Sequence, residues 1–171
     1  SHNFSLEKIR QHFKVPYWAV PCPVEYTKRG GLITYQGSGM LSVYCVFKSG
    51  SFMPGILNDI LLSSAEASLR SLDLPIHRGH GGTKSNPGLY IDPDKKIASV
   101  GLHFSAGVTR YGIAISLDPE AKYLRVCVPC GLKDIVLTSV ALETGHKKIS
   151  DAERLKIKTL LALEIQKRWL K

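Results

Sequence analysis

Three stretches of the chain repeat apolar residues with the period of an amphipathic helix. Residues Leu6 to Phe13 predict a short helix, and residues Ile56 to Leu72 predict a longer one. A third helix is predicted to begin at Ser150, which forms a capping-box pattern with Glu153. The residues expected on the apolar faces of the last two helices are Ile56, Ile60, Leu61, Ala65, Leu69 and Leu72, and then Leu155, Leu160, Leu163 and Trp169.

Short runs rich in Val, Ile and Tyr, separated by Gly, Pro, Asp and Ser, predict strands between these helices. Helices at both ends and one in the middle do not alternate strictly with strands, so the pattern predicts an α+β fold with a mixed β-sheet and flanking helices. The predicted strands are GLITY (31–35), MLSVYCVF (40–47), GLYID (88–92), KIASVGLHF (96–104), YGIAISL (111–117) and LRVCV (124–128).

The composition is typical of one compact globular domain. The chain has 171 residues, of which 44% are hydrophobic and 22% charged. It has no run of eighteen uncharged apolar residues, so we expect no membrane span, and its first residues lack the apolar segment of a signal peptide. Four unevenly spread cysteines argue against a disulfide framework and favour a reducing compartment.

The net charge of +9 is concentrated near the carboxyl end. Eight basic and three acidic residues fall between Lys147 and Lys171. A solvated helix face or an acidic protein partner would explain this charge, and so would nucleic-acid binding. Because aromatic-rich stacking signatures are missing, the pattern favours the first explanation.

Cys127 and Cys130 are the residues with the clearest candidate chemistry, and they allow three interpretations. Paired with His77 and His80 they would form a zinc site, although that HxxH lies in a glycine-rich loop. A thioredoxin-type dithiol would open a helix, whereas this segment is predicted to be a strand that ends in a turn. The third interpretation is a nucleophilic Cys130 whose thiolate is stabilised by an ammonium, for which Lys96 is a candidate if its strand lies alongside.

Five sequence blocks in order resemble those of the octanoyltransferases, also called lipoyl(octanoyl) transferases. The blocks are RGGLITYQGSG, PGLYI, KIASVG, VTRYGIAIS and VPCGLKDIVLTSV, and they cover Arg29 to Val140, about two-thirds of the chain. Glycines beside strands are typical of a backbone that approaches a ligand or another strand closely. Order and spacing shared over five blocks are more specific than any one of them.

The resemblance implies a single acyltransferase domain over residues 1–171, on the fold shared by biotin and lipoate protein ligases, with no cofactor and no metal. It implies that Cys130 accepts an octanoyl or lipoyl group from octanoyl acyl carrier protein as a thioester, and that Lys96 lowers the pKa of this thiol. The group then passes to a lysine on the lipoyl domains of ketoacid dehydrogenase E2 subunits or on the glycine cleavage H protein.

The resemblance also implies the substrate-binding residues and a location. The chain would work in the mitochondrial matrix, or otherwise in a bacterial cytoplasm. The residues expected to line the acyl tunnel with their backbone and small side chains are Arg29, Gly30, Gly31, Leu32, Ile33, Thr34, Tyr35, Gln36, Ser99, Val100, Gly101, Gly112, Ile113 and Ala114.

The chain departs from the family pattern around this pocket. Gln36 and Tyr111 stand where the blocks have histidines, Ser116 stands in place of an asparagine, and Ser38 and Met40 replace a proline and a glutamine. Glutamine cannot exchange a proton near neutral pH. In addition, the 28 residues before the RGG block do not reproduce the longer segment that is usual in the family.

Two hypotheses therefore stand. The chain is an active octanoyltransferase, or it is a non-catalytic relative that serves as a structural or binding subunit of a larger, RNA-containing mitochondrial assembly. Retention of both Cys130 and Lys96 favours the first, while the lost histidines and the positive charge favour the second.

Overall fold

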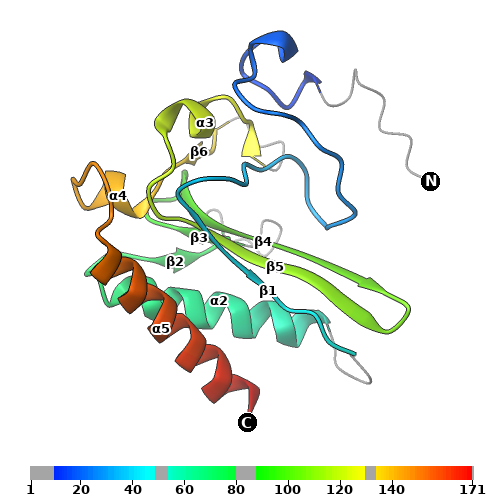
Figure 1. Cartoon of the computed structure of the whole chain (residues 1–171), viewed down its shortest axis with the longest axis vertical. Helices are drawn as coiled ribbons and strands as arrows, with labels where there is room; N and C mark the ends of the chain where they lie inside the picture. Colours follow the sequence, from blue (N-terminus) through cyan, green and yellow to red (C-terminus); the bar gives the residue numbers. More distant parts are fainter. Residues whose placement is uncertain (1–9, 49–53, 80–87, 130–133, 171) are drawn as a thin grey trace.

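A six-stranded sheet forms the centre of the structure, a computed structural model that describes residues 10–48, 54–79, 88–129 and 134–170 (Figure 1). The strand order is β1-β5-β4-β3-β2, and β6 pairs with the start of β4. The β4–β6 pairing is parallel and the others are antiparallel. The strands are β1 (Met40–Tyr44), β2 (His77–Arg78), β3 (Gly88–Tyr90), β4 (Lys95–Ser105), β5 (Val108–Ser116) and β6 (Val136–Leu137).

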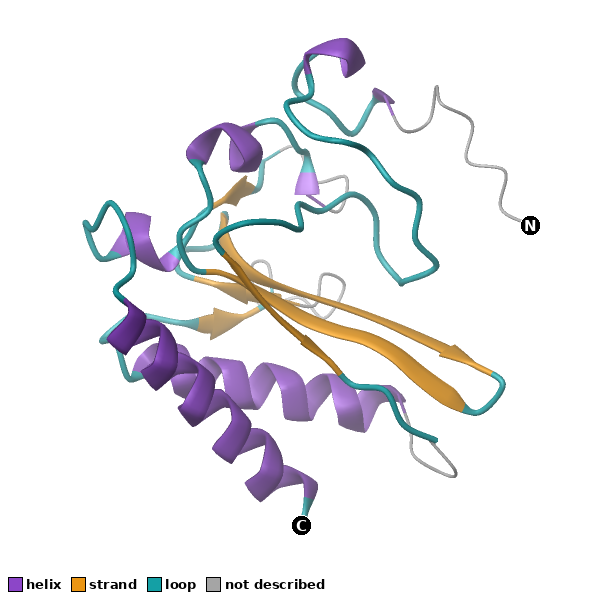
Figure 2. Ribbon diagram, viewed as in Figure 1, coloured by secondary structure: helices purple, strands orange, loops and turns teal. Residues whose placement is uncertain are grey.

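Helices flank this mixed sheet, which confirms the predicted α+β fold class. Figures 1 and 2 show α2 and α5 on one side of the sheet, with residues 10–39 and α3 on the other. In the described residues no helix is both long enough and apolar enough to cross a membrane. The helices are η1 (Tyr17–Ala19), α2 (Pro54–Arg70), α3 (Ala121–Arg125), α4 (Val140–Glu143) and α5 (Asp151–Trp169).

The hydrophobic core lies between the sheet and helices α2 and α5. Leu57, Leu61 and Leu69 of α2 are fully buried in it. The predicted apolar face of this helix is confirmed at Ile60, Leu61, Ala65 and Leu69. Ile56 is 49% exposed at the first turn, and Leu72 lies beyond the end of the helix and is half-buried. From β5, Ile113 and other residues of the same face complete the core.

The apolar face predicted for the last helix is wrong. Leu155 is 64% and Leu163 is 55% exposed, while Ile157 and Leu161 are buried. The capping box at Ser150 is present as predicted, so the start of the helix is correct. Because α5 carries leucine and isoleucine on more than one face, the period alone does not determine which face meets α2.

The strand predicted over residues 31–35 is absent. The guanidinium of Arg29 donates to the carbonyl of Leu32 at 2.7 Å, and the Gly30 N–H donates to the carbonyl of Leu102 in β4 at 3.0 Å. Gly31 has a φ of 85°, a left-handed conformation that a strand does not contain. These backbone groups are therefore satisfied outside a strand ladder, and the segment crosses the face of β4.

Two further predicted elements near the cysteines are corrected. In the strand predicted over residues 124–128, Leu124 lies in α3 and is buried, and Cys127 makes only an isolated bridge to Phe13. The short helix predicted to reach Phe13 lies partly outside the described residues. Its last residues are not helical, because their backbone pairs with the cysteine segment: the Val128 N–H donates to the carbonyl of His12 at 2.8 Å.

Asp118 joins the end of β5 to the start of α5. Its side chain is fully buried, and it accepts hydrogen bonds from the backbone N–H of Ile149 at 3.0 Å and from the guanidinium of Arg154. Burial opposes ionisation of this carboxyl, but these two hydrogen bonds and the charge of Arg154 outweigh burial and lower its pKa. A lowered pKa in the folded state means that the ionised carboxylate stabilises the fold.

We expect Asp118→Ala to lower the free energy of unfolding by about 2–3 kcal/mol at neutral pH, because it leaves the Ile149 N–H and Arg154 without their acceptor. Urea unfolding measures this loss. Because the folded pKa lies below the ordinary carboxyl value of about 4, the contribution of Asp118 is complete above that pH and is lost as the pH falls through the folded pKa.

Asp92→Ala serves as the matched control, since Asp92 forms an exposed ion pair with Lys95 at 3.1 Å. Its loss should be below about 1 kcal/mol. Equal losses in the two variants, or a loss for Asp118→Ala that does not shrink in acid, would contradict the assigned role of Asp118.

Candidate functional site

Lys96 lies at the start of β4 with strands on both sides. It pairs with Tyr90 of β3 and with Leu137 of β6, and it is 1% exposed. Its Nζ lies 5.4 Å from the centroid of the Tyr90 ring, within the range of a cation–π interaction. Because a buried ammonium is costly unless its surroundings compensate it, Lys96 is an unusual residue for the interior of a sheet.

Cys130 lies outside the described residues, but the chain on both sides of it is placed. Before it, Cys127 bridges Phe13. After it, β6 begins six residues later and runs parallel to the first two residues of β4. The Thr138 N–H donates to the carbonyl of Lys96 at 2.9 Å. Residues 136–138, which follow Cys130 in the sequence, are thus anchored on Lys95 and Lys96, and the distance between the side chains of Cys130 and Lys96 stays a prediction.

Cys127 has the properties of a packed thiol. It is 5% exposed, and burial raises the pKa of its thiol to about 11. At neutral pH it is therefore protonated and a poor nucleophile. Two of the four candidate zinc ligands, His80 and Cys130, lie outside the described residues, and the described part of the chain contains no cluster of three or more metal-ligating side chains.

A strip of small residues lies on the face of the sheet opposite the core. Leu102, Ile113 and neighbouring residues face the core, so alternation along the strands turns the residues between them to the other face. In register across the strands, Ser99 pairs with Ala114 and Gly101 pairs with Gly112. We call these residues, with Ser42 of β1, the small-residue strip.

The RGG segment lies directly on this strip. A Cβ atom added to Gly101 would lie 3.0 Å from Cδ of Arg29 and 3.2 Å from the carbonyl oxygen of Gly30. A Cβ atom on Gly112 would lie 2.0 Å from the carbonyl oxygen of Val43 in β1. Gly112 thus has no room for a side chain because of the neighbouring strand, and Gly101 is closely covered by the crossing segment.

Predicted binding residues from three distant stretches line one small cavity with Lys96. Its volume of about 10 Å³ is enough for one water molecule, far below the several hundred Å³ of a typical ligand pocket. The cavity between the sheet and the overlying segment, which we call the slot, is therefore too small for an acyl chain. Binding of an acyl chain would need the overlying segment to move. The lining residues are Thr34, Tyr35, Lys96, Ser99 and Ala114, together with Met40, Ile97, Ala98, Ser116, Leu124 and Leu137.

Tyr35, in the overlying segment, is one of the residues that line the cavity. It is 9% exposed and stacks on Tyr123 of α3, with ring centroids 4.8 Å apart and an interplanar angle of 7°. Its hydroxyl donates to the carbonyl of Ser38 at 3.4 Å. Tyr123 is not among the residues that the sequence suggests, because it lies between the fourth and fifth sequence blocks.

The remaining predicted residues take other places. The side chains of Val100 and Ile113 pack in or against the core, so only their backbone can reach the strip. Gln36 is exposed, and its Oε1 accepts a hydrogen bond from Ser42 Oγ at 2.8 Å. Leu32 and Ile33 are half-buried in the crossing segment.

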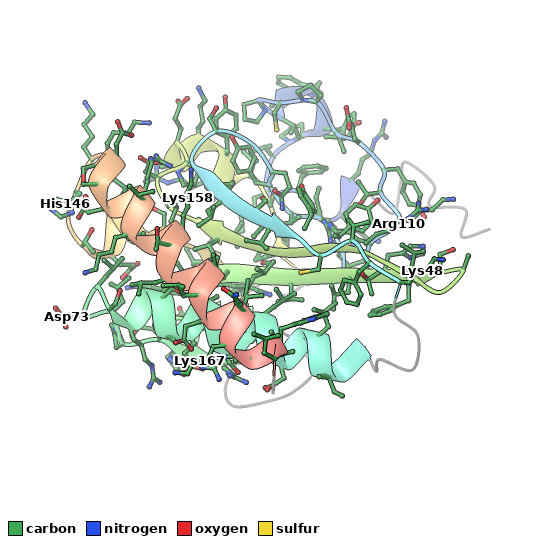
Figure 3. The ribbon with its side chains drawn as sticks, turned by 60° about the horizontal axis from the view of Figure 1, so that its bottom comes forward. Lys48, Asp73, Arg110, His146, Lys158 and Lys167 are labelled. Carbon is green, nitrogen blue, oxygen red and sulfur yellow. The ribbon has the colours of Figure 1, made fainter. Side chains whose placement is uncertain are left out.

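Basic side chains lie in separate groups. Figure 3 shows Lys48 and Arg110 at one end of the sheet and Lys158 and Lys167 along α5. Within α5, Lys167 contacts Glu164 at 3.7 Å, and Arg154 and Arg168 also have acidic partners. This distribution gives the nucleic-acid interpretation no specific support.

Comparison with known proteins adds the family. The chain is 32% identical to the mitochondrial octanoyltransferase LIP2 of Arabidopsis thaliana over 122 residues, which cover 71% of this chain and 51% of that protein. Several bacterial octanoyltransferases are similar at the same level. The chain spans about half the length of the curated relatives that it matches.

Solved structures confirm the predicted ligase-like fold. A lipoate-protein ligase A bound with ATP superposes with a TM-score of 0.60 at 19% identity, covering 83% of this chain and 57% of that one. The apo biotin protein ligase of Aquifex aeolicus gives 0.55 at 20% identity, covering 78% and 55%. The family model described as lipoyl protein ligase A/B catalytic domain matches residues 20–160. The chain therefore belongs to the lipoyl protein ligase A/B catalytic domain family.

Proposed function

We propose that the chain transfers an octanoyl or lipoyl group through a thioester on Cys130 to a lysine of a lipoyl-domain protein. The observation that carries the proposal is the buried Lys96, which pairs with β6 and lines one cavity with Ser99 and Ala114 of the small-residue strip. The plant and bacterial relatives described above are octanoyltransferases. Octanoyl acyl carrier protein is the proposed donor, and lipoyl domains of ketoacid dehydrogenases or the glycine cleavage H protein are the proposed acceptors.

The reaction has two balanced halves. The Cys130 thiolate attacks the donor thioester carbonyl, the tetrahedral intermediate expels the carrier thiolate, and the carrier thiolate takes up a proton. The acceptor amine then attacks the enzyme thioester, loses a proton, and releases the Cys130 thiolate. Exchange between thioesters is nearly isoenergetic, so the protein has to supply a stabilised thiolate, proximity and hydrogen bonds to the oxyanion.

The acyl chain would lie on the small-residue strip. At about 0.8 kcal/mol per buried methylene, an eight-carbon chain could contribute up to roughly 5 kcal/mol to binding. For this to happen, the segment that carries Arg29 and Tyr35 has to move away from Gly101 and Ala114. The donor would thus open the slot that is closed without it.

The compartment that we propose is the mitochondrial matrix, with a bacterial cytoplasm as the alternative. The plant relative is a mitochondrial octanoyltransferase, and other relatives are bacterial. A free Cys127 at the site is compatible with either compartment, because both are reducing.

Incubation with octanoyl acyl carrier protein should add one octanoyl group to the protein. Intact-mass measurement detects the adduct, and hydroxylamine should remove it because it is a thioester. Cys130→Ala should abolish the adduct, whereas the matched variant Cys127→Ala should retain it, since the thiol of Cys127 is buried and protonated. If no adduct forms at any pH from neutral to mildly alkaline, the proposal fails and the non-catalytic hypothesis stands.

Ala114→Leu should shorten the acyl chain that the protein accepts, because Ala114 lies on the small-residue strip and lines the cavity. We expect the rate with an octanoyl donor, relative to a butanoyl donor, to fall at least about tenfold, which corresponds to about 1.4 kcal/mol. The ratio is the measurement, since loss of stability from overpacking lowers both rates together. An unchanged ratio would place the acyl chain elsewhere.

A further inference from the structure

Two consecutive lysines at the start of β4 have opposite environments. The side chain of Lys95 is 43% exposed and contacts Asp92 at 3.1 Å and Glu143 at 3.8 Å. Lys96 is 1% exposed on the other face and lines the cavity. Since residues that follow each other in a strand point to opposite faces, only the second lysine is directed toward the proposed site.

Gly88 provides the space through which the Lys96 side chain passes. A Cβ atom added to Gly88 would lie 2.5 Å from Cε and 3.1 Å from Nζ of Lys96, and 2.6 Å from the carbonyl oxygen of Ala98. Gly88 pairs with Ser99 while Tyr90 pairs with Lys96, so Ile97 is an extra residue in β4. This bulge turns the lysine back across the glycine. The contacts with Lys96 and with the Ala98 carbonyl therefore leave no space for a side chain at Gly88.

Tyr90 provides the surface on which the amine rests. The residue is 0% exposed, and its ring centroid lies 5.4 Å from Lys96 Nζ. His77, its partner in β2, stacks against the same ring at 6.2 Å between centroids. Tyr90 is thus fixed between its two cross-strand neighbours. The negative face of an aromatic ring attracts an ammonium, so a fixed ring determines where the amine lies.

We propose that Gly88 and Tyr90 are positioning residues that hold the amine of Lys96 at its place in the cavity. This inference rests on the proposed function, in which Lys96 stabilises the Cys130 thiolate. Gly88 leaves space for the Lys96 side chain, and the ring of Tyr90 fixes the position of its amine. Neither residue touches the acyl group, and both act through the lysine.

The test is the pH dependence of Cys130 alkylation by iodoacetamide, followed by peptide mass. This readout reports the thiolate and needs no acyl donor. Lys96→Ala defines the full effect, which should be at least a tenfold slower alkylation at neutral pH. Tyr90→Leu and Gly88→Ala should each reproduce most of it, and Tyr90→Phe, which keeps the ring face, should restore the rate. Lys95→Ala should leave the profile unchanged.

The outcomes separate the two proposals. If Lys96→Ala slows alkylation but Tyr90→Leu and Gly88→Ala do not, or if Tyr90→Phe is as slow as Tyr90→Leu, the positioning role is overturned and the proposed function is not. If Lys96→Ala leaves the profile unchanged, activation of Cys130 by Lys96 fails, and the positioning role fails with it.

Thermal unfolding gives a second measurement that does not depend on reactivity. Gly88→Ala should destabilise the wild-type chain more than it destabilises a Lys96→Ala chain. In the wild-type chain the added methyl group meets both the Lys96 side chain and the Ala98 carbonyl, whereas in the Lys96→Ala chain it meets only the Ala98 carbonyl. Equal destabilisation in both backgrounds would overturn the role given to Gly88.

Discussion

A buried ammonium at the start of β4 is the constraint on which the rest of the site depends. Taking the charge of Lys96 out of water is costly, and an apolar side chain of similar length would fill the same space at a lower cost. Stability therefore gives no reason for a lysine at this position. The ring of Tyr90 attracts the amine from 5.4 Å, and Gly88 leaves the space that the lysine side chain crosses. Such an arrangement favours chemistry over packing as the reason for the lysine.

Two different neighbours limit the space at the glycines of the small-residue strip. At Gly112 the carbonyl of Val43 in the adjacent strand leaves no room for a side chain, whatever the protein binds. At Gly101 the restriction comes from Arg29 and Gly30, which lie in the crossing segment. The guanidinium of Arg29 bonds backbone carbonyls of its own segment, so this arginine shapes the cover of the slot. A substrate that displaces the cover would then meet a floor without side chains at Gly101.

The sequence predicted the elements whose period was unambiguous. The buried face of α2, the strands β1, β4 and β5, and the capping box of α5 all follow from local patterns. The segment at residues 31–35 does not, since the bonds that hold it come from the side chain of Arg29 and from β4. The contact between Lys96 and Gly88 could not be predicted either. It results from the extra residue Ile97, and periodicity does not reveal where a bulge lies.

The departures from the family pattern bear on activity according to where they lie. Gln36 is exposed and bonded to Ser42, and neither Gln36 nor Tyr111 lines the cavity around Lys96, whereas Ser116 and Met40 do. Tyr111 has a φ of 65°, in the left-handed region that costs a bulky residue on the order of 1–3 kcal/mol, and its carbonyl accepts the N–H of Cys45 at 2.8 Å. Tyr111 therefore has a structural role, because its backbone links β5 to the segment after β1. Gln36 and Tyr111 thus lie away from the cavity around the lysine, and the step that needs a stabilised thiolate does not require a proton from either of them.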